Sequence, residues 1–261
     1  MATARTTRRR LRRAAPGAGG FTTLTDFLTS LTPVRWYKCD EASGNLTDSG
    51  SGATNLVPQT ATEAYRAAGM FANDPNYAID LELSSLARFT ASGHILNTTG
   101  SIIVFFRPES LTTAHVMFAQ GSNDNVRYIS AIADPTEFRF RMTDSAGAYD
   151  VTLNDSSIPI SAGNWYMGVI TQAADGTGVK MYLNGVLGTT TTDTLSGNAT
   201  VNDWFFRSGT AGSTLTGLGN LPSAIAQPLP YDGRLAHVCV LSQILTQQQI
   251  TDLYTLATVV S

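Results

Sequence analysis

Cysteine is scarce in this chain of 261 residues, which has only Cys39 and Cys239. Two cysteines cannot provide the disulfide framework of a small secreted scaffold, and no Cys/His spacing typical of zinc ligands occurs. Charged residues are also few, at 14%, and no apolar run approaches the ~20 residues that cross a membrane as a helix. We therefore expect no disulfide scaffold, no structural zinc and no membrane partner.

Internal repeats are absent as well, whereas turn-forming residues are common. The chain contains 23 glycines and many Thr, Ser and Asn residues, a composition typical of all-β proteins with frequent turns. A chain of this length can bury one large β core, and all-β sandwiches of this size often form a single domain.

Acidic residues are missing from the start of the chain, where basic residues are concentrated. Six of the 17 basic residues lie in the first 13 positions, which leaves 11 basic against 20 acidic residues, a balance of −9, in the rest. We predict that residues 1–20 form a flexible basic arm and residues 21–261 an acidic domain. The arginines of the arm are Arg5, Arg8, Arg9, Arg10, Arg12 and Arg13.

Several interpretations of this arm are open. Residues 14–20 are small and include a proline, so the apolar segment of a secretory or twin-arginine signal is missing. An Arg-rich arm can bind phosphates, but the −9 domain would repel a nucleic-acid backbone, which argues against a nucleic-acid partner. A solvated tail is the plain alternative. We favour an anchor, for which an acidic protein surface is a suitable partner.

The second half of the chain contains a β-hairpin pattern. The apolar and aromatic run 164–171 is followed by a Gly-bearing loop, an alternating run over 179–183, and an Asn-Gly turn at 184–185. Alternation in the second run places Met181 and Leu183 on one face of a half-buried strand.

This hairpin resembles the laminin-G-like, concanavalin A-like jelly roll, in which a similar Trp-containing strand and Asn-Gly turn recur. The opening segment 33–52, with its Asp-Ser-Gly loop, and the closing segment 231–254 resemble the corresponding parts of that family. The resemblance spans roughly residues 21–258. It implies that the first and last strands are sheet neighbours, and we expect Trp165 to be largely buried.

The fold class predicted from these patterns is all-β, a two-sheet antiparallel jelly-roll sandwich with short terminal helices and the N-terminal basic arm. Apolar residues recur at helical spacing over 24–31, and Thr246 and Gln249 form a capping-box pattern at the start of the second helix. Further strands are predicted at 77–83, 101–108, 116–119, 128–132, 138–142 and 149–153.

Two further expectations follow from the position of residues in this fold. Cys39 and Cys239 lie in the first and last strands, and we predict two buried free thiols because a disulfide across neighbouring strands is geometrically demanding. The Gly/Ser/Pro stretch from Ser208 to Pro230 is long for a connection between strands, so we interpret it as an extended functional loop or an assembly contact.

Paired carboxylates are the strongest catalytic pattern in the sequence. Glycosidases of this superfamily carry alternating carboxylates on one strand, because an acid and a nucleophile must flank one glycosidic bond. Asp80 and Glu82 match two of the three positions, but Ala78 and Ser84 stand where the third acid would be. We therefore interpret the pair as the outward polar face of a half-buried strand and expect no catalytic residue.

Other candidate sites have weaker patterns. The histidines lack i, i+4 pairing, and no G-x-S-x-G nucleophile motif occurs: they are His94, His115 and His237. Three tyrosines would stack on a sugar ring if exposed, although most aromatics of a sandwich fill its core: Tyr65, Tyr149 and Tyr231. Calcium remains an unassigned alternative, since several loop residues offer oxygen ligands: Asn123, Asp124, Asn125, Asp134, Asp144, Asn154 and Asp155.

Three functional hypotheses remain. The leading one is a non-enzymatic structural protein of a bacteriophage virion, assembled in the host cytoplasm: a capsid decoration or cement subunit, anchored by its arm to capsid or tail proteins and forming a homo-oligomer. The alternative is a carbohydrate-binding adhesin or tail fibre protein that recognises host glycans. A divergent glycosidase is the third. The family resemblance does not separate them, because one fold hosts many functions.

Overall fold

The computed structural model describes residues 20–59, 64–70, 77–83, 88–93, 99–122, 128–135, 137–144, 147–153, 159–173, 178–196, 213–221 and 229–258. Its first elements are α1 (Leu24–Ser30), β1 (Arg35–Tyr37), β2 (Val57–Pro58), β3 (Ala64–Ala68), β4 (Tyr77–Leu81), β5 (Phe89–Ser92), β6 (Gly100–Pro108), β7 (His115–Ser122) and β8 (Tyr128–Asp134). The rest are β9 (Glu137–Asp144), β10 (Gly147–Leu153), β11 (Tyr166–Gln172), β12 (Val179–Leu183), β13 (Val186–Leu187), β14 (Thr190–Ser196), β15 (Ser213–Leu218), β16 (Gly233–Leu241) and α2 (Gln247–Thr258). The six arginines of the predicted arm lie outside the described residues.

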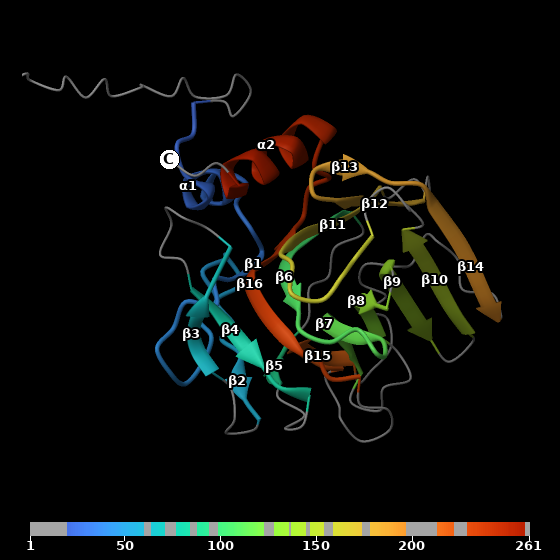
Figure 1. The fold of residues 1–261 in the computed structure, drawn as a ribbon, viewed down its shortest axis with the longest axis horizontal. Helices are drawn as coiled ribbons and strands as arrows, with labels where there is room; N and C mark the ends of the chain where they lie inside the picture. The colour runs from blue at the N-terminus through green and yellow to red at the C-terminus, as the bar shows by residue number, and fades with distance from the viewer. Residues whose placement is uncertain are drawn as a thin grey trace, which may run out of the picture.

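Two antiparallel sheets form a sandwich (Figure 1), which confirms the predicted fold class. Sheet I has the strand order β13-β12-β11-β6-β16-β4-β3, and β1 also pairs with β16. Sheet II has the order β14-β10-β9-β8-β7-β15-β5-β2. The first and last strands are neighbours as predicted, since Trp36 lies opposite Cys239 in the β1–β16 pair.

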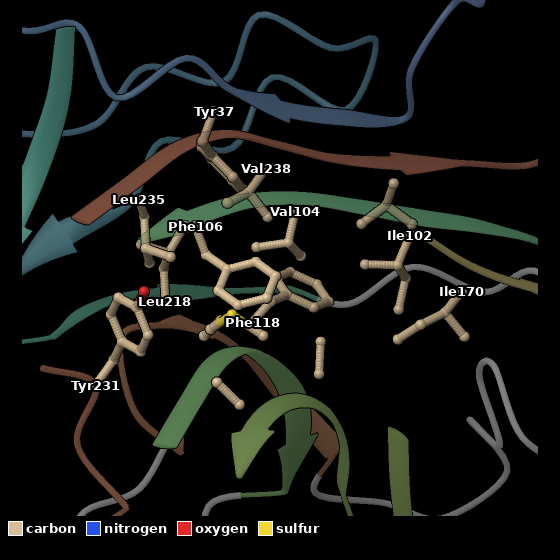
Figure 2. Packing of buried hydrophobic residues seen from close by; sticks show 14 of the residues in the cluster. Tyr37, Ile102, Val104, Phe106, Phe118, Ile170, Leu218, Tyr231, Leu235 and Val238 are labelled. Atoms are coloured by element: carbon tan, nitrogen blue, oxygen red, sulfur yellow. The ribbon is translucent and has the colours of Figure 1, made fainter. Parts of the chain in front are cut away.

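The main core lies between the two sheets, where apolar side chains of both inner faces meet (Figure 2). Phe106 of β6 stacks on Phe138 of β9 with ring centroids 5.9 Å apart, and on Tyr166 of β11 at 5.5 Å. Phe106 and Phe138 are fully buried. Gly168 makes this contact fit, because a Cβ at Gly168 would lie 2.6 Å from the Phe138 ring.

A second apolar cluster covers the outer face of sheet I beneath the two helices, which lie together in Figure 1. Thr23 caps α1 by accepting a hydrogen bond from the Asp26 amide at 3.0 Å. At α2, the Thr246 amide donates to Gln249 Oε1 at 2.9 Å and the Gln249 amide donates to Thr246 Oγ1 at 3.2 Å. This reciprocal pair confirms the capping box. Neither helix, nor any other in the described part of the chain, is long and apolar enough to cross a membrane.

The predicted hairpin is present as β11 and β12, followed by β13. Asn184 and Gly185 have φ values of 52° and 83°, the left-handed geometry of the two-residue turn that their sequence favours. Met181 and Leu183 point into the main core, whereas Tyr182 packs in the helix-side cluster. The face assignment made from alternation is therefore confirmed.

The stretch from Ser208 to Pro230 differs from the expectation of one extended loop. Residues 213–218 form β15, which pairs with β7 on one side and β5 on the other. Alternating Thr and Leu residues make this segment compatible with a strand despite its one glycine, Gly217. Beyond it, Leu221 and the half-buried Leu229 pack on the outer face of sheet II.

Both cysteines are buried free thiols, as predicted. Cys39 belongs to the main core and Cys239 to the helix-side cluster, so they face opposite sides of sheet I. Burial raises the pKa of each thiol well above its ordinary value.

Candidate functional site

The two carboxylates of the sequence pattern lie on the outer face of sheet I. Ile79 and Leu81 of β4 point into the main core, so Asp80 and Glu82 project from the opposite side. The expected outward face is therefore confirmed for the pair. Asp80 is nevertheless only 8% exposed, whereas Glu82 is exposed.

An arginine from the last strand accounts for the burial of Asp80. In the register of sheet I, Arg234 of β16 lies opposite Asp80 of β4 on one side and Arg107 of β6 on the other. Arg234 Nε donates to Asp80 Oδ2 at 2.9 Å. Arg107 Nη1 contacts Glu109 Oε1 at 2.8 Å, and Arg234 Nε lies 3.7 Å from the same oxygen. These five residues (Asp80, Glu82, Arg107, Glu109 and Arg234) are called the polar row below.

The backbone around the polar row holds its arginines in place. Arg107 Nε donates to the Gly163 carbonyl at 2.9 Å, and the Gly163 amide donates to the Pro108 carbonyl at 2.7 Å. Gly233, just before Arg234, has φ of 134°, and a Cβ there would collide with the Arg107 carbonyl oxygen. Only glycine combines this φ with so close a backbone approach, so it permits the β6–β16 contact at the site.

Trp165 directly precedes β11, near the Arg107 end of this row, and most of its surface is covered, in line with the sequence prediction. The residue is mostly covered but not fully buried, and it packs against the helix-side cluster. Its remaining exposure goes with its position, because Trp165 stands just before the first residue of β11. Neither hydrophobic alternation nor the family resemblance distinguishes a ring at the end of a strand from one in its middle.

The carboxylates of the row also form a geometric candidate for a metal site. One oxygen each of Asp80, Glu82 and Glu109 lies within 4.8 Å of the others. However, Arg234 already contacts Asp80 and Arg107 already contacts Glu109. Guanidinium groups in contact with the ligand atoms oppose a nearby cation, so we assign no metal here. What the row offers is a set of hydrogen-bond donors and acceptors at the surface.

The loop residues considered as calcium ligands do not form such a group within the described part of the chain. Asp134, at the end of β8, pairs with Arg139 at 3.0 Å. Asp144 ends β9, but its side chain is not described. The remaining candidates, Asn123, Asp124, Asn125, Asn154 and Asp155, lie outside the described residues.

The histidines do not join the polar row. His115 is fully buried, with Nδ1 2.7 Å from the Pro230 carbonyl oxygen. His237 is buried at a bulge in β16, where its Nδ1 accepts a hydrogen bond from the Trp36 indole N–H at 3.1 Å. His94 lies outside the described residues. Both described histidines are structural parts of the sandwich.

The tyrosines considered as sugar platforms are mostly placed elsewhere. Tyr231 is fully buried in the main core, and burial raises the pKa of its hydroxyl well above the ordinary value. Tyr65 is half-buried, stands edge-on to Phe89, and donates its hydroxyl to the Gly44 carbonyl at 2.6 Å. The side chain of Tyr149 is not described. Among the described residues, Trp165 is a partly exposed aromatic close to the polar row.

Comparison with known families identifies the domain. The model of the concanavalin A-like lectin/glucanases superfamily matches residues 84–251, more than half of the chain. The chain belongs to this superfamily. A comparison with curated proteins gives no significant sequence match.

Solved structures with a similar fold include one domain of an extracellular enzyme. Domain 4 of AbnA, a GH43 extracellular arabinanase from Geobacillus stearothermophilus, in complex with arabinotriose, is 20% identical with a TM-score of 0.59. The match covers 85% of this chain and 98% of that domain. At this level of identity the likeness shows a shared fold.

The binding domain of botulinum neurotoxin DC is a second structural neighbour. Its complex with SialylT is 12% identical with a TM-score of 0.58, and its complex with rat synaptotagmin II is 11% identical with a TM-score of 0.59. Each match covers 86% of this chain but 51% of the neurotoxin chain. This chain therefore spans about half the length of that neurotoxin chain.

Proposed function

We propose that this protein is a carbohydrate-binding module of the concanavalin A-like superfamily, which recognises a glycan without cleaving it. The observation that carries the proposal is the match to domain 4 of AbnA, which extends over 98% of a domain whose structure contains arabinotriose. The polar row supports it, because carboxylate and guanidinium groups at a surface suit the hydroxyl groups of a sugar.

The contacts of the polar row favour binding over hydrolysis. A glycosidase needs one carboxyl group to protonate the leaving oxygen and a second to act as nucleophile or base. Here Asp80 Oδ2 is held by Arg234 at 2.9 Å and Glu109 Oε1 by Arg107 at 2.8 Å. A carboxylate that is paired with a guanidinium group is poorly suited to act as general acid or nucleophile. Glu82 by itself would be one carboxyl group where hydrolysis needs two.

The basic arm gives this module a second proposed role, as the attached part of a larger assembly. Six arginines in the first 13 residues contrast with the balance of −9 in the rest of the chain, which suits an electrostatic anchor. In this proposal a bacteriophage capsid or tail carries the module, so that glycan recognition and virion attachment are properties of one adhesin.

Glycan binding is tested by applying the full chain to an array of neutral and acidic glycans and to immobilised polysaccharides. We expect retention on at least one glycan class, with no release of reducing sugar after prolonged incubation. Failure to bind any glycan would overturn the proposal. Release of reducing sugar that is abolished by the double variant Asp80→Asn, Glu82→Gln would replace it with a glycosidase.

A further inference from the structure

We propose that the glycan site lies on the outer face of sheet I, where Trp165 provides a ring platform at one end of the polar row, and that it takes a neutral sugar. This inference rests on the proposed carbohydrate binding and adds its location and its ligand class. It is carried by the register of the strands, the partial exposure of Trp165 and the charges of the row.

Strand register places Trp165 at the end of the row. The β11–β6 ladder pairs Met167 with Phe105 and ends at Tyr166 and Phe106. Extending its register by one residue puts Trp165, just before β11, opposite Arg107. Both side chains project from the outer face, because Met167 and Phe105 belong to the helix-side cluster. Residues directly opposite one another in antiparallel strands have Cβ atoms about 5 Å apart.

The sequence of side chains across the sheet is therefore Trp165, Arg107, Arg234 and Asp80. The β6–β16 and β16–β4 ladders fix the last three of these positions. Arg107 Nε also holds the Gly163 carbonyl at 2.9 Å, which ties the segment before Trp165 to the same row. An aromatic ring and a line of charged groups thus share one continuous face.

The groups of this face are accessible and already oriented. The side chains of Arg107 and Arg234 are each 26% exposed and that of Glu109 is 36% exposed. Their ion pairs restrict the side chains before any ligand arrives, so less conformational freedom is lost on binding. Oriented polar groups beside a partly exposed ring suit an open sugar site.

Sugar chemistry matches these two kinds of surface. One side of a pyranose or furanose ring presents C–H groups, and these can pack on the apolar face of an indole ring. The ring hydroxyls both donate and accept, so they can donate to Glu109 and accept from Arg107. The ring platform and the row therefore contact different parts of the same sugar.

Charge separates neutral from acidic ligands. Asp80, Glu82 and Glu109 outnumber Arg107 and Arg234, and both guanidinium groups are already paired with carboxylates. A sialic acid or uronic acid carboxylate placed here would find no unpaired cation in the row and would be repelled by its acids. We therefore expect the site to prefer neutral sugars.

Calorimetry measures the affinity of the full chain for three ligands. They are arabinotriose, 3′-sialyllactose and the neutral oligosaccharide that binds best on the array. Trp165→Ala should weaken neutral-sugar binding about tenfold, as loss of an aromatic contact predicts, and Glu109→Gln by about threefold. Tyr77→Ala is the matched control, because Tyr77 is an exposed aromatic beside Arg66 on the same strand as Asp80. It should change affinity less than twofold.

A second readout separates a ligand platform from a structural residue. Trp165→Phe keeps an aromatic ring, so it should retain the fold and part of the affinity while removing the change in tryptophan fluorescence that the sugar causes in the native protein. Sugar binding that is unaffected by Trp165→Ala and Glu109→Gln would overturn this location and leave the carbohydrate-binding function intact. Tighter binding of 3′-sialyllactose than of any neutral sugar would overturn the ligand class. No binding to any glycan would instead reject the proposed function.

Discussion

Trp36 donates its indole N–H to Nδ1 of His237 at 3.1 Å, joining residues 201 positions apart in the chain. Both side chains are buried, at 3% and 4% exposure. His237 has a left-handed φ of 45° and sits at the β-bulge where β16 leaves β4 and meets β1. An indole N–H only donates, so Nδ1 must be an unprotonated acceptor. The contact fixes the bulge against the first strand.

Replacing Trp36 with Phe should lower the free energy of unfolding by about 1–3 kcal/mol, because the buried His237 nitrogen loses its donor. Chemical denaturation at pH 7.5 measures the change. Val186→Ala is the control, since Val186 is 49% exposed on β13, and it should change stability by less than about 0.5 kcal/mol. Equal effects of the two substitutions would contradict a structural role for the Trp36–His237 bond.

The Trp36–His237 contact at the bulge is a feature that the sequence pattern does not predict. The family resemblance predicts that the first and last strands pair, and they do. The hydrogen bond is not predicted, because β1 pairs with only the last part of β16 and β4 with its first part. That division depends on a one-residue irregularity, which local alternation does not encode.

Asp48 organises the polar loop that follows the first strand. Its carboxylate accepts backbone N–H groups of Trp36 at 2.9 Å, Gly50 at 2.8 Å and Thr54 at 2.9 Å, and it contacts Arg35 at 3.2 Å. The Asp48 side chain is fully buried and that of Arg35 is 8% exposed.

We expect Asp48→Ala to destabilise the fold by about 3–5 kcal/mol, the range for breaking a buried ion pair from one side. The neighbouring exposed Ser49, changed to Ala, should have little effect. Thermal and urea unfolding of both variants give the comparison. A loss below about 1 kcal/mol for Asp48→Ala would mean that Arg35 and the loop amides find water instead.

The two buried thiols predict a loss of stability at alkaline pH. Burial raises the pKa of Cys39 and of Cys239 in the folded state, whereas in the unfolded chain a thiol ionises near pH 8.5. Below that pH the folded and the unfolded state both keep the thiol proton, so the free energy of unfolding has its full value. Above it only the unfolded state releases the proton, and stability falls by up to about 1.4 kcal/mol per pH unit for each thiol.

Urea unfolding between pH 7 and 9 measures this slope, because nearly all tyrosines, whose ordinary pKa is about 10, still keep their proton in this range. The double variant Cys39→Ala, Cys239→Ala should show a flatter dependence than the native protein, whatever its stability at pH 7. A thiol reagent should also modify the folded native protein far more slowly than the urea-unfolded chain. An unchanged slope in the double variant would refute the linkage.

The polar row illustrates why the candidate site was harder to predict than the fold. The hairpin, the capping box and the face of Met181 follow from residues close in sequence, so local pattern was sufficient. Arg234 is 154 positions from Asp80, and it reaches Asp80 because β16 lies between β6 and β4. The sequence predicts that Asp80 and Glu82 share one face. It does not predict that Arg107 and Arg234 lie next to them, because this depends on the order of β6, β16 and β4 in the sheet. Strand order is a non-local property that composition and spacing leave open.

The boundary between arm and domain yields a prediction about which N-terminal residues matter for folding. Phe21 is half-buried against the helix-side cluster, with its ring edge-on to Phe27 at 5.1 Å between centroids, and Thr23 caps α1. Residues 1–19 lie outside the described structure. We therefore predict that folding needs the chain from about residue 20 onward, while attachment needs the arginines before it.

Two truncations, one lacking residues 1–19 and one lacking residues 1–22, test this division. The first keeps Phe21 and should unfold at the temperature of the full chain; the second loses its aromatic contact, about 1 kcal/mol, and should unfold a few degrees lower. Both truncated proteins should still bind any glycan that the full chain binds. Both should lose the salt-sensitive adsorption of the full chain to an acidic matrix, because the six arginines are gone. If the protein comes from a virion, the shorter truncation should also fail to join particles. Destabilisation by removing residues 1–19 alone would place the arm within the folded domain, and unchanged adsorption would assign attachment to the sandwich itself.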